Sequence, residues 1–278
     1  MSPTPSPPTT SACGTCALNN AANLRRLGVD PSGHDLVVAL AGNPNTGKST
    51  VFNALTGLRQ HVGNWAGKTV DRAEGGFEYH ERRYKLVDLP GTYSLLSTSE
   101  DEDIARDFLV FGRPDVTTVV VDATRLERDL NLVLQILQIT TRVVVAVNLV
   151  DEARRHGITV DFRHLSRELG VPAVGMAARR GTGIEDLLDA VERVALSPTS
   201  FGGRRLIHRN RRLERAVSHL AERVARHVPG VTNPRWVALR LLEGDATLER
   251  AVAEGRLREL VADPAELRSE TVPEEPDA

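Results

Sequence analysis

Residues 42–49 have the types and spacing that hold phosphate groups. They match the pattern of glycine, four residues, glycine, lysine and then serine or threonine, and they lie between an apolar run and a helical pattern. In such a loop the backbone N–H groups point at phosphate oxygens, and the positive end of the helix dipole adds to the attraction. Lys48 would neutralise the β- and γ-phosphates, and Ser49 would bind Mg²⁺. The residues expected to contact a nucleotide here are Asn43, Asn45, Thr46, Gly47, Lys48, Ser49 and Thr50.

Two later segments are expected to respond to the γ-phosphate. Asp88 and Gly91 form an Asp-x-x-Gly sequence after the next buried strand, where the carboxylate can hold the Mg²⁺ shell and the glycine N–H can approach the phosphate. Asp-x-x-Gly by itself is a common turn. It is assigned to the phosphate site here because it follows the phosphate loop in the chain at a suitable distance. Between the two segments, Thr69 ends a glycine-rich loop over residues 62–69 and is the candidate to close over Mg²⁺ and the γ-phosphate. The alternative is a surface loop with an incidental threonine.

Asn148 and Asp151 favour a guanine base over an adenine base. The Asp151 carboxylate can accept hydrogen bonds from the N1–H and 2-amino groups of guanine, and adenine does not offer both. The usual pattern is Asn-Lys-x-Asp, and Leu149 replaces the lysine here, which removes a contact over the base and sugar. Ala177 and Ala178 fit the last guanine loop, whose backbone N–H reaches the base oxygen, although Ala177 replaces the usual serine. The sequence therefore predicts binding of GTP and GDP.

Hydrolysis is expected to be slow. Many GTPases place glutamine directly after Asp-x-x-Gly to orient the attacking water, and Thr92 occupies that position. The side-chain carbonyl of Asn45 would be able to bind a monovalent cation beside the phosphates, which supplies positive charge where a catalytic arginine acts in other enzymes. The alternative for Asn45 is ordinary capping of the loop. The residues expected to take part in hydrolysis are Asn45, Lys48, Thr69 and Gly91.

These segments require a scaffold in which buried strands end at one edge. Short apolar runs alternate with helical patterns, which is typical of a mostly parallel sheet with helices on both faces. The expected strands are at residues 36–41, 84–87, 116–121, 143–147 and 173–176. The expected helices are at residues 49–56, 100–111, 129–139, 162–169 and 184–194. The predicted fold class is the α/β fold of the Ras-like P-loop GTPases, followed by a small all-α domain.

The chain is expected to divide into four parts. Residues 1–34 form a flexible extension with Cys13 and Cys16, residues 35–195 the G domain, residues 196–262 a helical domain and residues 263–278 an acidic flexible tail. Two cysteines are half of the four ligands that a zinc site needs, so the pair is a redox pair, part of a site completed by a partner, or two idle thiols.

Composition excludes several classes of protein. The 278 residues carry 35 basic and 37 acidic side chains, so the net charge of −2 gives no general attraction to nucleic acid or anionic lipid. No apolar run approaches the ~20 residues that span a bilayer. The chain is therefore expected to be soluble and cytoplasmic. The eight arginines between residues 204 and 227 lack interleaved aromatic residues, which favours a solvated helix face over a nucleic-acid surface.

The motifs resemble those of FeoB-type ferrous iron transporters. The resemblance covers residues 35–262 and rests on residues 42–50, 52–57, 62–65, 88–95 and 236–245. The specific features are the Asn64–Trp65 pair and Thr92 after Asp-Leu-Pro-Gly. Three positions depart from the family pattern: Ala66 replaces a usual proline, Lys68 an apolar residue and Ala177 a serine.

This resemblance implies a GTP-hydrolysing regulatory module whose helical domain slows nucleotide release. It implies a K⁺ site at Asn45, assisted by backbone carbonyls around Gly63 and Trp65. The partner would be a membrane domain that moves Fe²⁺, in the same chain or a companion chain, with this part on the cytoplasmic side of the bacterial inner membrane. A homo-oligomer remains open, as does whether the chain is a piece of a longer protein.

Two other functions remain open from the sequence. One is a ribosome-assembly GTPase that binds RNA, favoured only by the basic stretch over residues 204–227. The other is a binding switch with negligible turnover, suggested by Thr92.

Overall fold

The central element is a seven-stranded sheet with the order β2-β3-β4-β1-β5-β6-β7. The structure is a computed structural model, and it describes residues 21–57, 60–96, 99–197, 210–228 and 233–255. The strands are β1 (Leu36–Gly42), β2 (Gln60–Asn64), β3 (Asp71–Tyr79), β4 (Arg82–Asp88), β5 (Val116–Asp122), β6 (Val143–Asn148) and β7 (Ala173–Gly175). All neighbouring strands are parallel except β2 with β3 and β3 with β4. The mostly parallel sheet expected from the sequence is confirmed.

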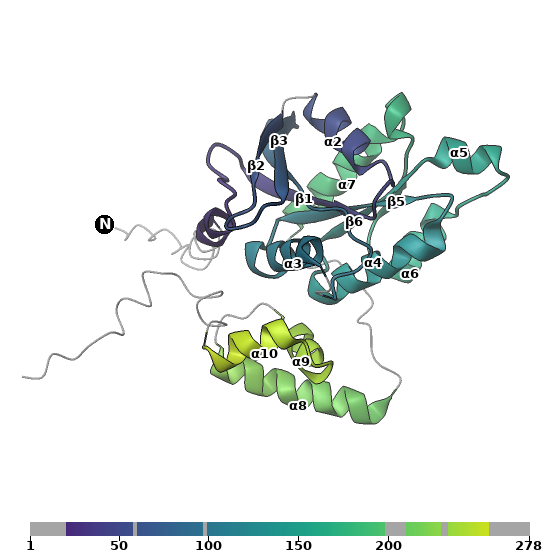
Figure 1. Cartoon of the computed structure of the whole chain (residues 1–278). Coiled ribbons are helices and arrows are strands. Elements are labelled where there is room, and N and C mark those ends of the chain that lie inside the picture. Colours follow the sequence, from purple (N-terminus) through teal and green to yellow (C-terminus); the bar gives the residue numbers. More distant parts are fainter. Residues whose placement is uncertain (1–20, 58–59, 97–98, 198–209, 229–232, 256–278) are drawn as a thin grey trace, which may run out of the picture.

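Helices cover both faces of the sheet (Figure 1). One face packs on α2 (Lys48–Thr56) and α7 (Ile184–Leu196), and the other on α3 (Glu100–Asp107), α4 (Leu126–Ile139) and α6 (Phe162–Leu169). Successive residues of a strand point to opposite faces, so the apolar runs supply both cores. The expected helix over residues 100–111 changes to a π-helical turn at Phe108–Gly112, and the short α5 (Val150–Arg155) was not predicted.

The strands β2 and β3 are the main difference from the expected fold. The sequence indicates a glycine-rich loop over residues 62–69, whereas residues 60–79 form an antiparallel hairpin. The middle of β3 is buried as an ionic cluster, since Arg72 lies 2.6 Å from Glu74 and Lys85 of β4 also pairs with Glu74. Burial through paired charges leaves no alternation of apolar and polar residues, and that alternation is the pattern from which strands are predicted.

Residues 21–34 pack against the G domain, so the expectation of a flexible extension is wrong for this part. A helical turn over residues 21–26 buries Leu24, and Val29 is buried after it in the same apolar cluster as Phe108. The burial of these two aliphatic side chains favours the packed segment, because returning them to water would cost about 1.5–3 kcal/mol each. Cys13 and Cys16 and the acidic tail lie outside the described residues.

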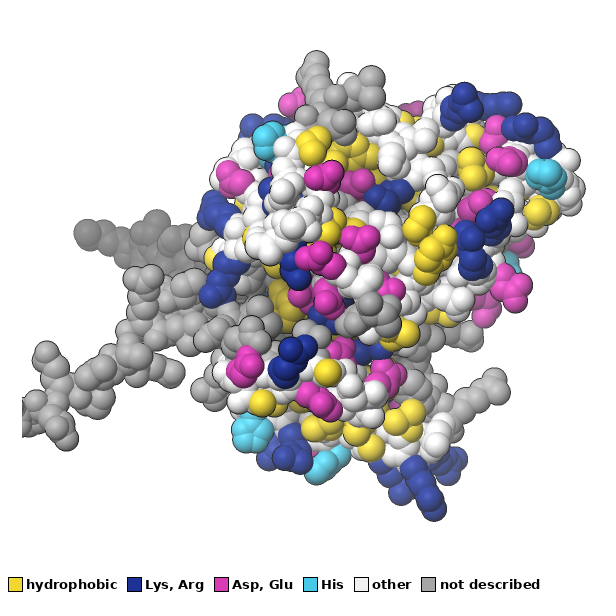
Figure 2. All heavy atoms as spheres, viewed as in Figure 1, with side chains coloured by type: hydrophobic (Ala, Val, Ile, Leu, Met, Phe, Trp, Pro, Cys, Tyr) yellow, Lys and Arg dark blue, Asp and Glu magenta, His cyan; other side chains and the backbone are white. Residues whose placement is uncertain are grey.

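The helical domain consists of α8 (Arg211–His227), α9 (Pro234–Leu242) and α10 (Ala246–Ala253) in the described part of the chain. Val217 of α8 packs on Ala238 and Leu239 of α9 in a small core of their own. Five arginines of α8 are exposed around the buried positions: Arg211, Arg212, Arg215, Arg223 and Arg226. Figure 2 shows basic and acidic side chains interspersed over this domain, as on a solvated surface.

The helical domain lies beneath α3 and α4 and contacts both (Figure 1). Trp236 of α9 belongs to the apolar cluster that contains Phe108. The Asn233 side chain donates to the carbonyls of Gln138 and Ile139 at the end of α4, at 2.6 and 3.0 Å. The last carbonyls of a helix have no partner within it, so this asparagine caps the end of α4. Its Oδ1 also accepts from the Trp236 N–H and so caps the start of α9. No helix among the described residues is long and apolar enough to cross a bilayer.

Candidate functional site

The phosphate loop joins β1 to α2 at the carboxyl edge of the sheet. Gly47 has a left-handed backbone with φ of 84°, and a Cβ atom there would lie 2.3 Å from the Asn148 side-chain nitrogen. Asn45 also has a positive φ, 67°, a conformation that asparagine tolerates better than most residues. Thr46 is buried, and its hydroxyl donates to the Asn43 carbonyl at 2.9 Å inside the loop. Two left-handed residues and this internal bond give the loop a tight curve between β1 and α2.

Lys48 and Asp88 meet at the base of this loop as a hydrogen-bonded ion pair. Burial raises the pKa of Asp88, and the neighbouring Lys48 ammonium offsets part of that shift. A cavity of about 390 Å³ opens beside them, with Lys48, Ser49 and Thr50 in its lining. In the described residues, no group of three or more His, Cys, Asp or Glu side chains is arranged so that it could hold a metal ion. A metal here would be held by the Ser49 hydroxyl, the Asp88 carboxylate and phosphate oxygens, and oxygen donors of this kind suit Mg²⁺.

Asn148 joins the phosphate loop to the last loop of the site. Its buried side chain donates to the Thr46 carbonyl at 3.0 Å and accepts from the Ala178 N–H at 3.0 Å. The structure therefore brings Asn148, Ala177 and Ala178 together as predicted, but the Ala178 N–H donates to Asn148. The Asp151 carboxylate is partly exposed and pairs with Arg180 at 3.1 Å and Arg155 at 3.4 Å. Arginines on both sides hold the carboxylate that is expected to recognise guanine.

The structure does not bring Thr69 to the phosphate loop. Thr69 is exposed in the turn between β2 and β3 and lines neither cavity beside the loop. The turn is held by Trp65, whose ring is 4% exposed and packs edge-on against Phe108 with 5.5 Å between ring centroids. The Trp65 carbonyl accepts from the Lys68 N–H at 3.0 Å, and Gly63 is paired with Arg72 within the hairpin. In this arrangement the residues proposed to assist Asn45 in binding K⁺ are engaged in the hairpin.

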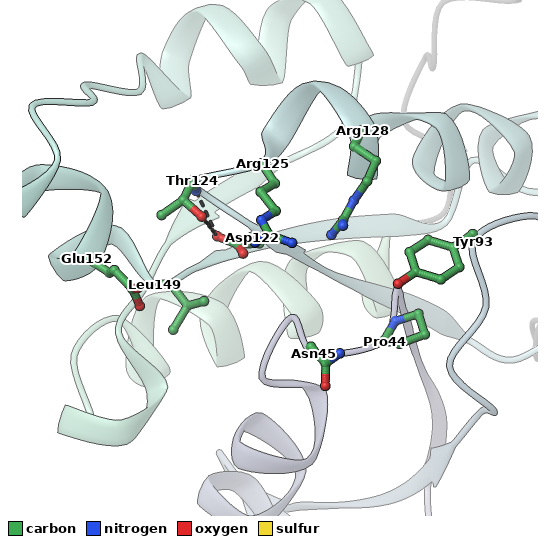
Figure 3. A pocket seen from close by; sticks show the side chains of 9 residues that line it. All are labelled: Pro44, Asn45, Tyr93, Asp122, Thr124, Arg125, Arg128, Leu149 and Glu152. Carbon is green, nitrogen blue, oxygen red and sulfur yellow. Dashed lines mark hydrogen bonds between the residues drawn. The ribbon is translucent and has the colours of Figure 1, made fainter.

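A second cavity, of about 350 Å³, lies on the other side of the loop (Figure 3). Its lining residues are Pro44, Asn45, Tyr93, Asp122, Thr124, Arg125, Arg128, Leu149 and Glu152. Figure 3 shows Asn45 and Pro44 on one side of the cavity, the Tyr93 hydroxyl end near Pro44, and Arg125 and Arg128 reaching in from the opposite side. The residues at the end of β5 and the start of α4 were not predicted from the sequence as part of the site. Their position directly after a predicted strand could have identified them, because ligands of open α/β sheets bind beyond the carboxyl ends of the strands.

Two family models match the chain. The first, described as "Ferrous iron transport protein B", matches residues 36–191, and the second, "FeoB cytosolic helical domain", matches residues 210–277. Their division coincides with the division between the sheet domain and the three-helix domain.

Known proteins with the same arrangement are similar over most of the chain. The Fe(2+) transporter FeoB of Salmonella typhimurium is 44% identical over 214 residues, which cover 76% of this chain and 27% of that protein. The cytosolic domain of T. maritima FeoB in a GDP form has a TM-score of 0.72 and 35% identity, with coverage of 84% of this chain and 89% of that one. Its GMPPNP form has a TM-score of 0.71 and 36% identity, with coverage of 82% and 87%. The chain spans about a quarter of the length of its curated relatives.

Proposed function

The chain belongs to the ferrous iron transport protein B family, and on that premise we propose that it is the GTP-binding and slowly GTP-hydrolysing module of a ferrous iron transport protein. The observation that carries the proposal is the arrangement of Lys48, Asp88 and Asn148 around one phosphate loop at the carboxyl edge of the sheet. Each of the three comes from a different strand end or helix start, so the fold, rather than one local motif, assembles the site.

The roles of the residues follow from their chemistry. Lys48 turns from Asp88 to the β- and γ-phosphates, and the loop N–H groups from Asn43 to Thr50 bind the remaining oxygens. Ser49 and Asp88 would hold Mg²⁺, which would supply positive charge to neutralise the phosphates. The Gly91 N–H approaches the γ-phosphate. Asp151 exchanges Arg180 for the guanine base. The loop with Ala177 and Ala178 would lie beside the base oxygen, and one of its two amides would have to leave its present partner, Thr182 for Ala177 and Asn148 for Ala178, to donate to that oxygen.

The glycine-rich segment over residues 62–69, here called the first switch, has to leave its hairpin contacts to complete the site. Thr69 reaches Mg²⁺ and the γ-phosphate only if the turn over residues 65–70 rearranges. The same movement would free the Trp65 carbonyl and place it, with that of Gly63, near Asn45 as ligands for K⁺. The contact of Trp65 with Phe108 is therefore a cost that GTP binding must offset, and it favours slow hydrolysis.

The helical domain is proposed to slow nucleotide release. The segment over residues 88–95, here called the second switch, is bonded to the two helices that contact this domain. The Leu95 N–H donates to Gln135 of α4 at 2.7 Å, and the Ser94 hydroxyl donates to Glu102 of α3 at 2.8 Å. On the far side of α3, the buried Arg106 lies 3.6 Å from Asp245. A change in the second switch is thus transmitted to the helical domain through packed helices.

For the whole transporter, the proposed partner is a membrane domain that moves Fe²⁺, with this chain on the cytoplasmic side.

Single-turnover GTP hydrolysis in potassium and in sodium buffer tests the proposal. We expect slow hydrolysis that potassium accelerates, and loss of that acceleration in Asn45→Ala. The matched control is Asn131→Ala, which removes an exposed asparagine of α4 and should keep the acceleration. Equal hydrolysis rates in the two buffers would overturn the potassium site. GTP binding without any GTP hydrolysis would show that the chain is a binding switch and not a GTPase.

A further inference from the structure

The Asp129 carboxylate in the first turn of α4 is fully buried, with 0% of the residue exposed. Its Oδ1 accepts from the Asn43 side-chain amide at 2.8 Å and from Arg128 Nε at 2.9 Å. Its Oδ2 accepts from the backbone N–H of Asp122 at 2.9 Å. A buried carboxylate is stable only when donors satisfy it, and these three come from the phosphate loop, α4 and the end of β5.

The phosphate loop is bonded from two sides. Asn148 donates to the carbonyl of Thr46 in the second half of the loop, at 3.0 Å. Asp129 accepts from Asn43 in the first half. Asn43 is 2% exposed, and its Oδ1 has no hydrogen-bond partner in the described part of the chain. Because a carboxylate only accepts hydrogen bonds, Asp129 determines which end of the Asn43 amide faces α4.

Asp129 is also connected to the second switch. Arg128, which donates to Asp129, places its guanidinium 5.4 Å from the centre of the Tyr93 ring. Tyr93 follows Thr92, whose N–H donates to the Gly42 carbonyl at 3.3 Å. Figure 3 shows Arg128 reaching into the cavity beside Tyr93, whose hydroxyl end lies near Pro44 of the phosphate loop. The first turn of α4 thus contacts both the phosphate loop, through Asn43, and the second switch, through Tyr93.

We propose that Asp129 is a positioning residue for nucleotide binding, which acts through Asn43 to hold the first half of the phosphate loop in its phosphate-binding curvature. This inference rests on the proposed GTP-binding function. Asp129 itself touches no nucleotide. The Asn43 amide transmits its effect, since it is the only side chain of the loop that bonds to Asp129.

The test is a double-mutant cycle on nucleotide affinity with Asp129→Asn and Asn43→Ala, read with fluorescent GDP and a non-hydrolysable GTP analogue. Each single variant should weaken binding about tenfold. Asn43→Ala removes the buried hydrogen bond to the charged carboxylate, and Asp129→Asn removes that charge and puts an amide donor where one carboxylate oxygen accepted. The double variant should also be weakened about tenfold rather than about a hundredfold, since both changes remove the same interaction. Glu127→Gln, an exposed acid in the same turn, is the control and should bind as the unmodified chain does.

Several outcomes would overturn the inference. One is a nucleotide affinity that is unchanged in folded Asp129→Asn. Another is a double variant weakened about a hundredfold, which is the product of the two single effects. If Asp129→Asn does not fold, Asn43→Ala decides, because it leaves Asp129 its two other donors; full affinity in that variant overturns the inference. A lowered melting temperature with unchanged affinity would assign Asp129 to stability alone. An unmodified chain that binds no guanine nucleotide would instead overturn the proposed function.

Discussion

The phosphate loop and the first-switch hairpin lie at the same edge of the sheet but are held in different ways. The loop is held by polar bonds to buried side chains, from Asn148 on one side and Asp129 on the other. The hairpin turn has backbone hydrogen bonds within itself, but its contacts with the rest of the domain include the apolar packing of Trp65 on Phe108 and an exposed ion pair of Lys68 with Glu100, 3.5 Å apart. Hydrogen bonds are directional and fix one geometry, whereas a single packed ring can be withdrawn as a unit.

This difference indicates a division of labour. The loop residues already have the curvature that phosphate needs, and Thr69 does not yet lie beside them. In the proposed function, guanine nucleotide binding depends on the loop, and the response to the γ-phosphate depends on the hairpin. Substitutions in the two regions should therefore affect different measurements.

The largest effect is expected in the loop. Lys48→Ala should weaken GTP and GDP binding at least about a thousandfold, or ~4 kcal/mol, because it removes the buried charge that faces the phosphates. Folding should be kept, since Asp88 becomes protonated or hydrated in the cavity. Isothermal titration calorimetry measures the loss, with Arg215→Ala on the exposed side of α8 as the control. Full affinity in Lys48→Ala would remove the phosphate-loop assignment.

The hairpin should show the opposite pattern. Trp65→Ala should lower the free energy of unfolding by about 3 kcal/mol, because it deletes a buried aromatic ring. GDP affinity should change by less than about threefold, since no loop contact is lost. Trp65→Phe is the matched control: it keeps a ring against Phe108 and removes an indole N–H that has no partner in the described residues. Equal losses of stability and GDP affinity would show that the two regions are not separate.

Recognition of the guanine base should depend on Asp151 and not on the first-switch hairpin. Asp151→Asn should weaken GTP binding about tenfold, because an amide in place of the carboxylate repels one donor of guanine. Xanthosine triphosphate should then compete, since its base carries a carbonyl where guanine has the amino group. Competition binding is the measurement, and Asp186→Asn, an exposed carboxylate in the first turn of α7, is the control. Unchanged preference for GTP would contradict the guanine-site assignment.

The smallest effect is expected at the far end of β3. His80 Nδ1 lies 2.8 Å from Glu192 of α7, and this hydrogen bond raises the pKa of His80 above its ordinary 6.5. A raised histidine pKa means that the pair stabilises the folded protein below pH 6.5 and that this contribution is lost as the pH rises through the folded-state value. The melting temperatures of the unmodified chain and His80→Gln should therefore differ slightly in acid and converge in alkali. A gap that widens with rising pH would contradict this account.

The sequence was sufficient to predict the elements whose burial is apolar. The runs at β1, β5 and β6 and the phosphate-loop pattern predicted the sheet and its binding edge. It was insufficient for β3, because Glu74 is buried with Arg72 and Lys85, and a charged stretch predicts exposure. Asp129 was missed for the same reason. An acid in the first turn of a helix is usually solvated, and only the fold shows that it faces Asn43.

Trp65 fluorescence tests the central claim most directly. Trp65 and Trp236 are the only tryptophans, so Trp236→Phe leaves Trp65 as the single reporter of the hairpin. With Mg²⁺ and potassium present, a non-hydrolysable GTP analogue should shift its emission to longer wavelength as the ring leaves Phe108, and GDP should leave the emission unchanged. An unchanged emission at a saturating analogue concentration, verified by displacement of fluorescent GDP, would contradict a hairpin that moves in response to the γ-phosphate.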